Sequence, residues 1–138
     1  MRKLIYEGFF LAHNGRGMDN MLKGKLERDI LDKHITTEFK PKEAHPDLYG
    51  IGAWFKLIGY ANDGKNEGYS VELFQIDSTA PDEYREKLKA LYNAIPIPHI
   101  TLSVSVDGKP KDTANLDFEP VKRDQFTIVY AQFNGFFA

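Results

Sequence analysis

The chain contains no cysteine among its 138 residues. This absence excludes disulfide bonds, thiolate nucleophiles and cysteine-based zinc or iron–sulfur sites, and it fits the cytoplasm, the compartment that we expect. Long apolar runs are also missing, because none approaches the roughly 20 residues that a membrane helix needs. Charged residues interrupt the N-terminal segment too early for a secretory signal peptide. We therefore expect no membrane partner.

An excess of positive charge is absent as well. The chain has 18 Lys+Arg against 20 Asp+Glu, which gives a net charge of −2. Proteins that grip a long duplex through its phosphates are usually visibly basic, so we expect no duplex nucleic acid as a partner. A small phosphorylated ligand, such as a cyclic nucleotide or a short RNA end, needs only a few well-placed groups. The composition, with 42% hydrophobic and 28% charged residues, is that of a globular domain.

Hydrophobic periodicity and turn residues predict the order strand, helix, strand, strand, and this order occurs twice. In the first half, alternation and Asp63-Gly64 predict a hairpin, and Thr79 is the predicted cap of the second helix. The predicted helices are 18–31 and 79–95. The predicted strands are 3–12, 33–41, 51–60, 68–76, 99–106, 116–121 (a short edge strand because of Pro120) and 125–137.

This pattern predicts an α+β fold made of two antiparallel-sheet lobes with one main helix each. We expect the lobes to be duplicated about a pseudo-twofold axis, with a cleft between them. No linker rich in proline or serine separates them, so residues 1–138 are expected to form a single bilobal domain with halves 1–66 and 67–138. We expect a monomer.

One tripeptide appears in both halves, as His34-Ile35-Thr36 and as His99-Ile100-Thr101. If Ile and Thr each take roughly 6% of positions, a given His is followed by Ile-Thr about 0.4% of the time. Each copy follows a predicted helix and opens a predicted strand. Two matches among four histidines, in equivalent places, therefore indicate a shared role rather than chance.

Side chains alternate between the two faces of a strand, so each histidine shares a face with the threonine two residues later. The same alternation predicts that Ser103 and Ser105 lie on the face of His99, and that Glu38 and Lys40 lie on the face of His34. The intervening apolar residues are expected to pack on a helix. If the two lobes face each other, two imidazoles and two hydroxyls converge.

Such a site suits a phosphodiester. One neutral histidine can take a proton from the attacking water or hydroxyl, while the other, protonated, gives one to the leaving oxygen, since the imidazole pKa of about 6.5 lies near working pH. The hydroxyls of Thr36 and Thr101 can donate to the non-bridging oxygens of the phosphate. The chemistry requires no metal and no cofactor. Further substrate contacts are expected from Ser103 and Lys40, and from three aromatic residues that could stack on a base, namely Tyr6, Phe10 and Tyr130.

Two His-hydrophobic-Thr motifs, one in each half of a small α+β chain, resemble the 2H phosphoesterase family, which includes cyclic phosphodiesterases and RNA 2′–5′ ligase-like proteins. His99-Ile100-Thr101-Leu102 matches the family pattern fully, whereas His34-Ile35-Thr36-Thr37 has Thr37 where a hydrophobic residue is usual. The resemblance implies that His34 and His99 form the acid/base pair and that Thr36 and Thr101 bind phosphate. It also implies that a 2′,3′-cyclic phosphate is hydrolysed to a 2′-phosphate.

Two other interpretations stay open. The same cleft could bind a nucleotide or an RNA end without turnover, and the altered position Thr37 and the short chain favour this. Alternatively, the histidines could lie far apart on solvated sheet faces of a structural protein. The sequence identifies neither the substrate nor which histidine is the base. The two other histidines, His13 and His45, are interpreted as solvated loop residues.

Overall fold

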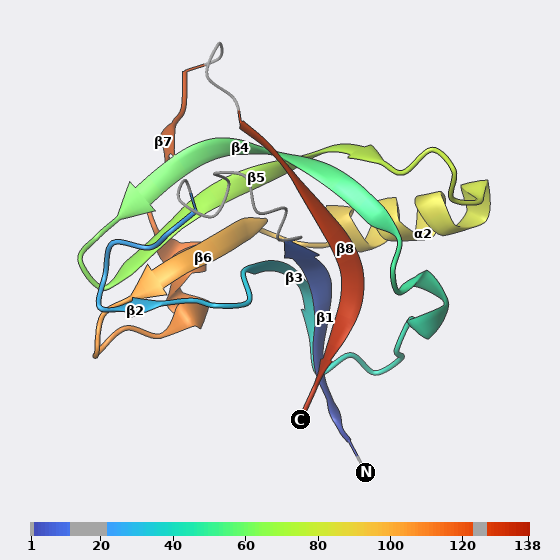
Figure 1. Ribbon diagram of the computed structural model, residues 1–138, viewed down its shortest axis with the longest axis horizontal. Coiled ribbons are helices and arrows are strands. Elements are labelled where there is room, and N and C mark those ends of the chain that lie inside the picture. The colour runs from blue at the N-terminus through green and yellow to red at the C-terminus, as the bar shows by residue number, and fades with distance from the viewer. Residues whose placement is uncertain (1, 12–21, 123–126) are drawn as a thin grey trace.

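The computed structural model describes residues 2–11, 22–122 and 127–138, and its main feature is one antiparallel sheet of eight strands (Figure 1). Together with its helix, this sheet gives the α+β class that the sequence predicts. The elements in chain order are β1 (Leu4–Leu11), β2 (Arg28–Asp29), β3 (His34–Phe39), the 3-10 turn η1 (Pro46–Leu48), β4 (Gly52–Asn62), β5 (Asn66–Ile76), α2 (Asp82–Asn93), β6 (His99–Val104), the 3-10 turn η2 (Pro110–Asn115), β7 (Glu119–Pro120) and β8 (Thr127–Phe137).

The strands follow the order β2-β6-β5-β4-β8-β1-β3, and β7 pairs with β4 beside this path. The predicted two sheets are therefore one continuous sheet, because β4 and β8 are hydrogen-bonded to each other from Gly52↔Gln132 to Leu57↔Thr127. The long strands β4, β5 and β8 curve strongly across the molecule (Figure 1). As a result, β3 and β6 contact each other although they lie near opposite ends of the strand order.

The hairpin between β4 and β5 forms at the predicted Asp63-Gly64 turn. Gly64 has a φ of 87°, in the left-handed region that glycine adopts without a steric penalty. The carboxylate of Asp63 accepts hydrogen bonds from the backbone N–H groups of Lys65 and Asn66, at 2.9 and 2.8 Å. These bonds hold the pKa of Asp63 below its usual range. The local chemistry of the turn thus fixes the pairing of two long strands.

Helix α2 packs on the sheet through Leu88, which is fully buried in the main core cluster. The middle residues of the two motifs, Ile35 and Ile100, belong to the same cluster and are also fully buried, as alternation predicts. The predicted cap is wrong, because the Thr79 hydroxyl donates instead to the carboxylate of Asp77. Pro81 occupies the N-cap position without a side-chain bond.

The predicted helix 18–31 is wrong over the part that the structure describes. Residues 22–27 form turns and irregular chain, and β2 pairs with β6. Gly24 lies so close to β6 that an added Cβ would sit 2.2 Å from the Cβ of Ser103. Tertiary partners satisfy the backbone here, since Leu26 N–H donates to the Ser103 hydroxyl at 3.1 Å. Periodicity alone does not reveal such competition for backbone donors. Residues 18–21 lie outside the described chain.

Candidate active site

The two motif histidines are held in the same way. Each is the first residue of its strand, His34 in β3 and His99 in β6. The Nδ1 atom of each ring lies 2.8 Å from the carbonyl oxygen two residues earlier, that of Asp32 or Ile97. Because a carbonyl oxygen only accepts, Nδ1 carries the hydrogen in both rings. This leaves Nε2 of each neutral ring as the atom that can take up a proton.

A β-bulge lies within each motif strand, directly after the threonine. The extra residue is Thr37 in β3 and Leu102 in β6. In the β1–β3 pair, Gly8 faces Thr36 and the register shifts between Glu7 and Gly8. In the β5–β6 pair, Gly68 faces Thr101 and the register shifts between Glu67 and Gly68. A bulge adds one unpaired residue to a strand and moves every later side chain to the other face.

The glycines at these bulges allow very close approach to the motif strands. A Cβ added at Gly8 would lie 2.4 Å from the backbone oxygen of Ile35, and one at Gly68 would lie 2.5 Å from that of Ile100. Real Cβ atoms do not come this close to backbone. Glycine is therefore required at both positions for the motif strands to sit where they do.

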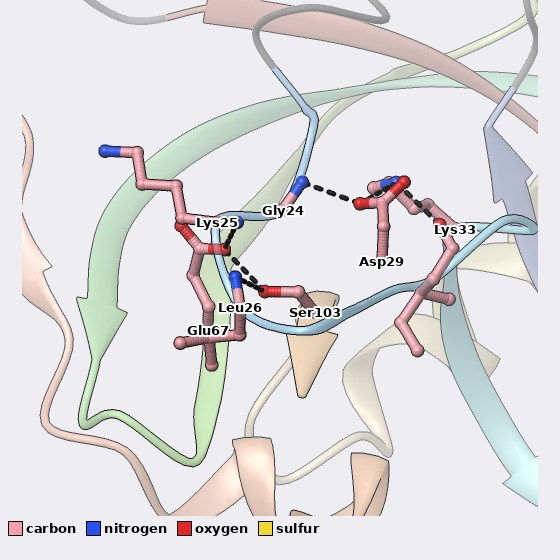
Figure 2. Close-up of polar contacts among 8 residues, drawn as sticks. Gly24, Lys25, Leu26, Asp29, Lys33, Glu67 and Ser103 are labelled. Carbon is pink, nitrogen blue, oxygen red and sulfur yellow. Dashed lines mark hydrogen bonds and ion pairs between the residues drawn. The ribbon is translucent and has the colours of Figure 1, made fainter. Parts of the chain in front are cut away.

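A buried glutamate precedes each glycine, and both side chains are 1% exposed. Glu67 accepts hydrogen bonds from Lys25 N–H and from the Ser103 hydroxyl, both at 2.7 Å, and from the Tyr60 hydroxyl. Figure 2 shows the Glu67 carboxylate reaching the backbone of the 24–26 segment and the Ser103 side chain. Burial and this carboxylate raise the pKa of Tyr60 to about 12. The carboxylate thus ties β5, opposite the bulge in β6, to a segment distant in sequence.

Glu7 makes the corresponding bonds in the other half. It accepts from the backbone N–H and from Nδ1 of His45, both at 2.8 Å, and from the Tyr49 hydroxyl at 2.7 Å. The interpretation of His45 as a solvated loop residue is therefore wrong, because its ring is bound to a buried carboxylate. His13 lies outside the described residues. Sequence reasoning missed both glutamates, although the repeat Glu-Gly-aromatic at 7–9 and 67–69 was visible in the sequence.

The two motifs are close enough to interact. Burial is the largest cause that lowers the pKa of His34. The hydrogen bond to the Asp32 carbonyl opposes this effect, and the charge on His99 lowers the pKa further. The contact between β3 and β6 agrees with this electrostatic coupling. A positive charge on His99 thus disfavours a positive charge on His34.

Aromatic rings surround His34. Its ring stacks on Tyr6 with centroids 4.7 Å apart and lies 5.3 Å from Phe10, the residue that it faces across the β1–β3 pair. His99 instead faces Ser70 across the β5–β6 pair. The structure therefore brings two of the predicted aromatic contacts, Tyr6 and Phe10, directly to the first motif.

The two motif threonines differ in their hydrogen bonding. Thr101 donates to the Thr113 hydroxyl at 2.9 Å and lies 3.3 Å from the Pro110 carbonyl oxygen. Within the described part of the chain, no hydrogen bond engages the Thr36 hydroxyl; the neighbouring Thr37 hydroxyl donates to the Glu7 carbonyl oxygen at 3.1 Å. Thr37, the position that departs from the family pattern, is thus the extra residue of the bulge in β3, and its hydroxyl bonds to β1.

The other three predicted substrate contacts, which are Ser103, Lys40 and Tyr130, lie elsewhere. The bulges turn Ser103 and Glu38 away from the motif face, contrary to the simple alternation predicted above, because Glu67 faces Ser103 and Glu7 faces Glu38 after each shift. Ser103 is fully buried and bound by Glu67. Lys40 follows the far end of β3, with its Nζ 5.5 Å from the centroid of the Phe39 ring.

Tyr130 lies on β8 and packs against Trp54 of β4 with centroids 4.8 Å apart. No described contact joins it to either motif histidine. Among the described residues, no group of three or more His, Asp or Glu side chains is arranged to hold a metal ion. The described chain also contains no helix that is long and apolar enough to cross a membrane.

Neither a protein-family model nor a curated protein matches the chain. The functional proposal therefore depends on three features: two histidines held alike, a Glu-Gly pair opposite the bulge in each motif strand, and a threonine two residues after each histidine.

Proposed function

We propose that the chain is a metal-independent phosphoesterase of the 2H type that hydrolyses a cyclic phosphate or a short RNA end. His34 and His99 are the acid/base pair, and Thr36 and Thr101 bind the phosphate. The observation that carries the proposal is the matched hydrogen bond from Nδ1 of each histidine to a carbonyl oxygen at 2.8 Å. This bond leaves the two Nε2 atoms for proton transfer, on strands that contact each other.

The proposed step needs one neutral and one protonated imidazole. The neutral ring takes a proton from water as the water oxygen attacks phosphorus, and the protonated ring gives a proton to the oxygen that leaves. With a 2′,3′-cyclic phosphate the bond from phosphorus to the 3′ oxygen breaks, and the product is a 2′-phosphate. The threonine hydroxyls donate to the non-bridging oxygens, where negative charge grows. Burial first, and then the charge on His99, lower the pKa of His34, which favours His34 as the neutral ring.

We also infer that the two halves are related by a pseudo-twofold axis, with the substrate cleft between the motifs. Three features support this arrangement. The strand order β6-β5-β4 is mirrored by β3-β1-β8 about the junction of β4 and β8. In each half, the strand with the Glu-Gly pair (β1 or β5) is antiparallel to a His-Ile-Thr strand (β3 or β6) that bulges directly after its threonine. The two buried glutamates bind loops in the same manner. This relation does not require the predicted helix 18–31, which the described residues 22–31 do not form.

The test is hydrolysis of 2′,3′-cyclic nucleotides and of RNA with a cyclic phosphate end, measured in EDTA. Substitution by asparagine keeps an N–H donor near the position of Nδ1 and removes Nε2. We therefore expect His34→Asn and His99→Asn each to lower the rate by about 10²–10⁴-fold with little change in thermal stability. His45→Asn is the matched control, since it can still donate to Glu7, and it should retain the rate. Activity that survives both motif substitutions would contradict the proposal.

A second candidate is a binding module without turnover. The hydrogen bond that Thr101 donates to Thr113 favours it, because this hydroxyl hydrogen is then not available to the non-bridging oxygen on which negative charge grows in the transition state. Binding of a 2′-phosphate or cyclic nucleotide by the wild-type chain, with no hydrolysis across a substrate panel and no loss of binding in His99→Asn, would support this candidate against the enzyme.

A further inference from the structure

An exposed row of aromatic side chains continues away from His34. Phe39, Tyr6 and Phe136 are cross-strand neighbours on β3, β1 and β8, because Tyr6 faces Phe39 in one pair and Phe136 in the other. The Tyr6 and Phe136 rings are stacked, with centroids 5.0 Å apart and an angle of 9° between their planes. Phe39 is 63% exposed and Phe136 is 40% exposed. We call these three residues the aromatic row.

The row is joined to the candidate active site by direct ring contact. Tyr6, its middle member, stacks on the imidazole of His34 at 4.7 Å with an angle of 23°. Phe10 extends the same surface, with its ring centroid 5.9 Å from that of Tyr6. Ring contacts therefore run from the proposed general acid/base through Tyr6 to Phe136, and Phe39 lies opposite Tyr6 in the β1–β3 pair.

Exposed basic residues lie at this end of the sheet. Lys40 N–H donates to the Ile5 carbonyl oxygen at 2.8 Å, and its ammonium group lies 5.5 Å from the Phe39 ring centroid. Lys3 pairs with Ala138 beside the last residues of β8, at 2.9 Å, and is exposed like its neighbour Arg2. Lys40, Lys3 and Arg2 thus place three positive charges at this end of the sheet, although the net charge of the whole chain is −2. They are placed to meet phosphates that accompany stacked bases.

We propose that the aromatic row is a stacking surface for the bases of a single-stranded oligonucleotide whose terminal phosphate lies at His34. This inference rests on the proposed function and names its substrate class, the end of a single strand rather than a free mononucleotide. Aromatic faces bind every base, since each base presents a π surface, and nearby cations follow the backbone. A protein partner is disfavoured because cations accompany the rings: the ammonium group of Lys40 lies 5.5 Å from the Phe39 ring centroid, and Lys3 and Arg2 are exposed at the same end of the sheet.

Equilibrium binding tests the inference without requiring turnover. Fluorescence anisotropy would compare the full chain with a labelled single-stranded RNA hexamer that ends in a phosphate, with the corresponding mononucleotide as competitor. We expect the hexamer to bind at least tenfold more tightly. Phe39→Ala and Phe136→Ala should each weaken hexamer binding by about tenfold, the usual effect of losing one stacked base. Phe39→Ala should leave mononucleotide binding unchanged.

Phe74→Ala is the matched control. Phe74 is 50% exposed and has the ammonium group of Lys56 5.0 Å from its ring centroid, but it lies on β5 beside α2 and apart from both motifs. This variant should bind the hexamer like the wild type. Because Phe39 and Phe74 are both largely exposed, neither truncation should unfold the chain, which circular dichroism would verify.

The outcomes separate this inference from the proposed function. Hydrolysis of cyclic mononucleotides with no gain in affinity for the hexamer would overturn the inference and leave the function standing. Equal effects of Phe39→Ala and Phe74→Ala would also overturn it, as would association of the chain with itself that is abolished by Phe39→Ala. Tight hexamer binding that depends on the aromatic row, without any hydrolysis, would support the row as a stacking surface and contradict the proposed enzymatic function.

Discussion

The two motif regions share their backbone design and differ in their surroundings. Both histidines open a strand, donate from Nδ1 to a carbonyl oxygen and follow the same arrangement of bulge, glycine and buried glutamate. Across the strand pair, however, Phe10 faces His34, whereas Ser70 faces His99. The backbone features that the two regions share position the two histidine rings. The cross-strand residues, which differ, determine what each ring contacts.

This difference teaches that duplication of a motif need not duplicate its chemistry. The aromatic side of the molecule buries His34 and lowers its pKa, and it continues into the exposed aromatic row. On the other side, η2 supplies the Thr113 hydroxyl to Thr101. Two geometrically similar histidines can thereby take different protonation states, which acid/base catalysis needs.

The largest expected effect comes from the glycine that faces the motif threonine in both regions. Gly8→Ala and Gly68→Ala should each destabilise the fold by about 3 kcal/mol or more, because the new methyl group collides with the backbone oxygen of Ile35 or Ile100. Urea denaturation would measure this. Gly64→Ala is the control, since it meets no atom within 4 Å and should cost only about 1 kcal/mol from its positive φ. A large loss at one motif and none at the other would break the comparison.

A smaller loss is expected at the buried glutamates. Glu7→Gln and Glu67→Gln keep the shape of the side chain but place an N–H₂ group among hydrogen-bond donors. We expect each to lower the free energy of unfolding by about 2 kcal/mol. Tyr60→Phe should cost less than Glu67→Gln, since it removes only one of the three donors to that carboxylate. The reverse order would show that the carboxylate does not hold the segment around Lys25.

The smallest expected effect comes from the cross-strand partner of the histidine, which differs between the two regions. Phe10→Ser gives His34 the cross-strand partner that His99 has, and we expect it to raise the pKa of His34 toward 6.5 by reducing burial. In the wild type the lowered pKa means that the unfolded chain binds more protons below pH 6.5, so stability falls as the pH falls. The variant should lose less stability between pH 7.5 and 5.5. NMR titration of the His34 ring would measure the pKa directly, and an unchanged value would rule out Phe10 as a cause.

Sequence patterns predicted most of the strands and the second helix because these rely on local chemistry. The Asp63-Gly64 turn and the alternation through Ile35 and Ile100 both survive in the fold. Alternation failed beyond the third residue of each motif, where the bulges displaced Ser103 and Glu38. A bulge depends on the partner strand, so one strand's own periodicity does not reveal it.

The sequence by itself determined the α+β class, the absence of thiol chemistry and the prominence of the two His-Ile-Thr copies, since composition and local period suffice for these. Only the tertiary structure decided that residues 24–30 lie along β6, that Glu7 and Glu67 are buried opposite the bulges, and that Tyr6 stacks on His34. Each of these depends on which distant groups satisfy a buried donor or cover a ring. Such choices follow from packing in three dimensions rather than from neighbours along the chain.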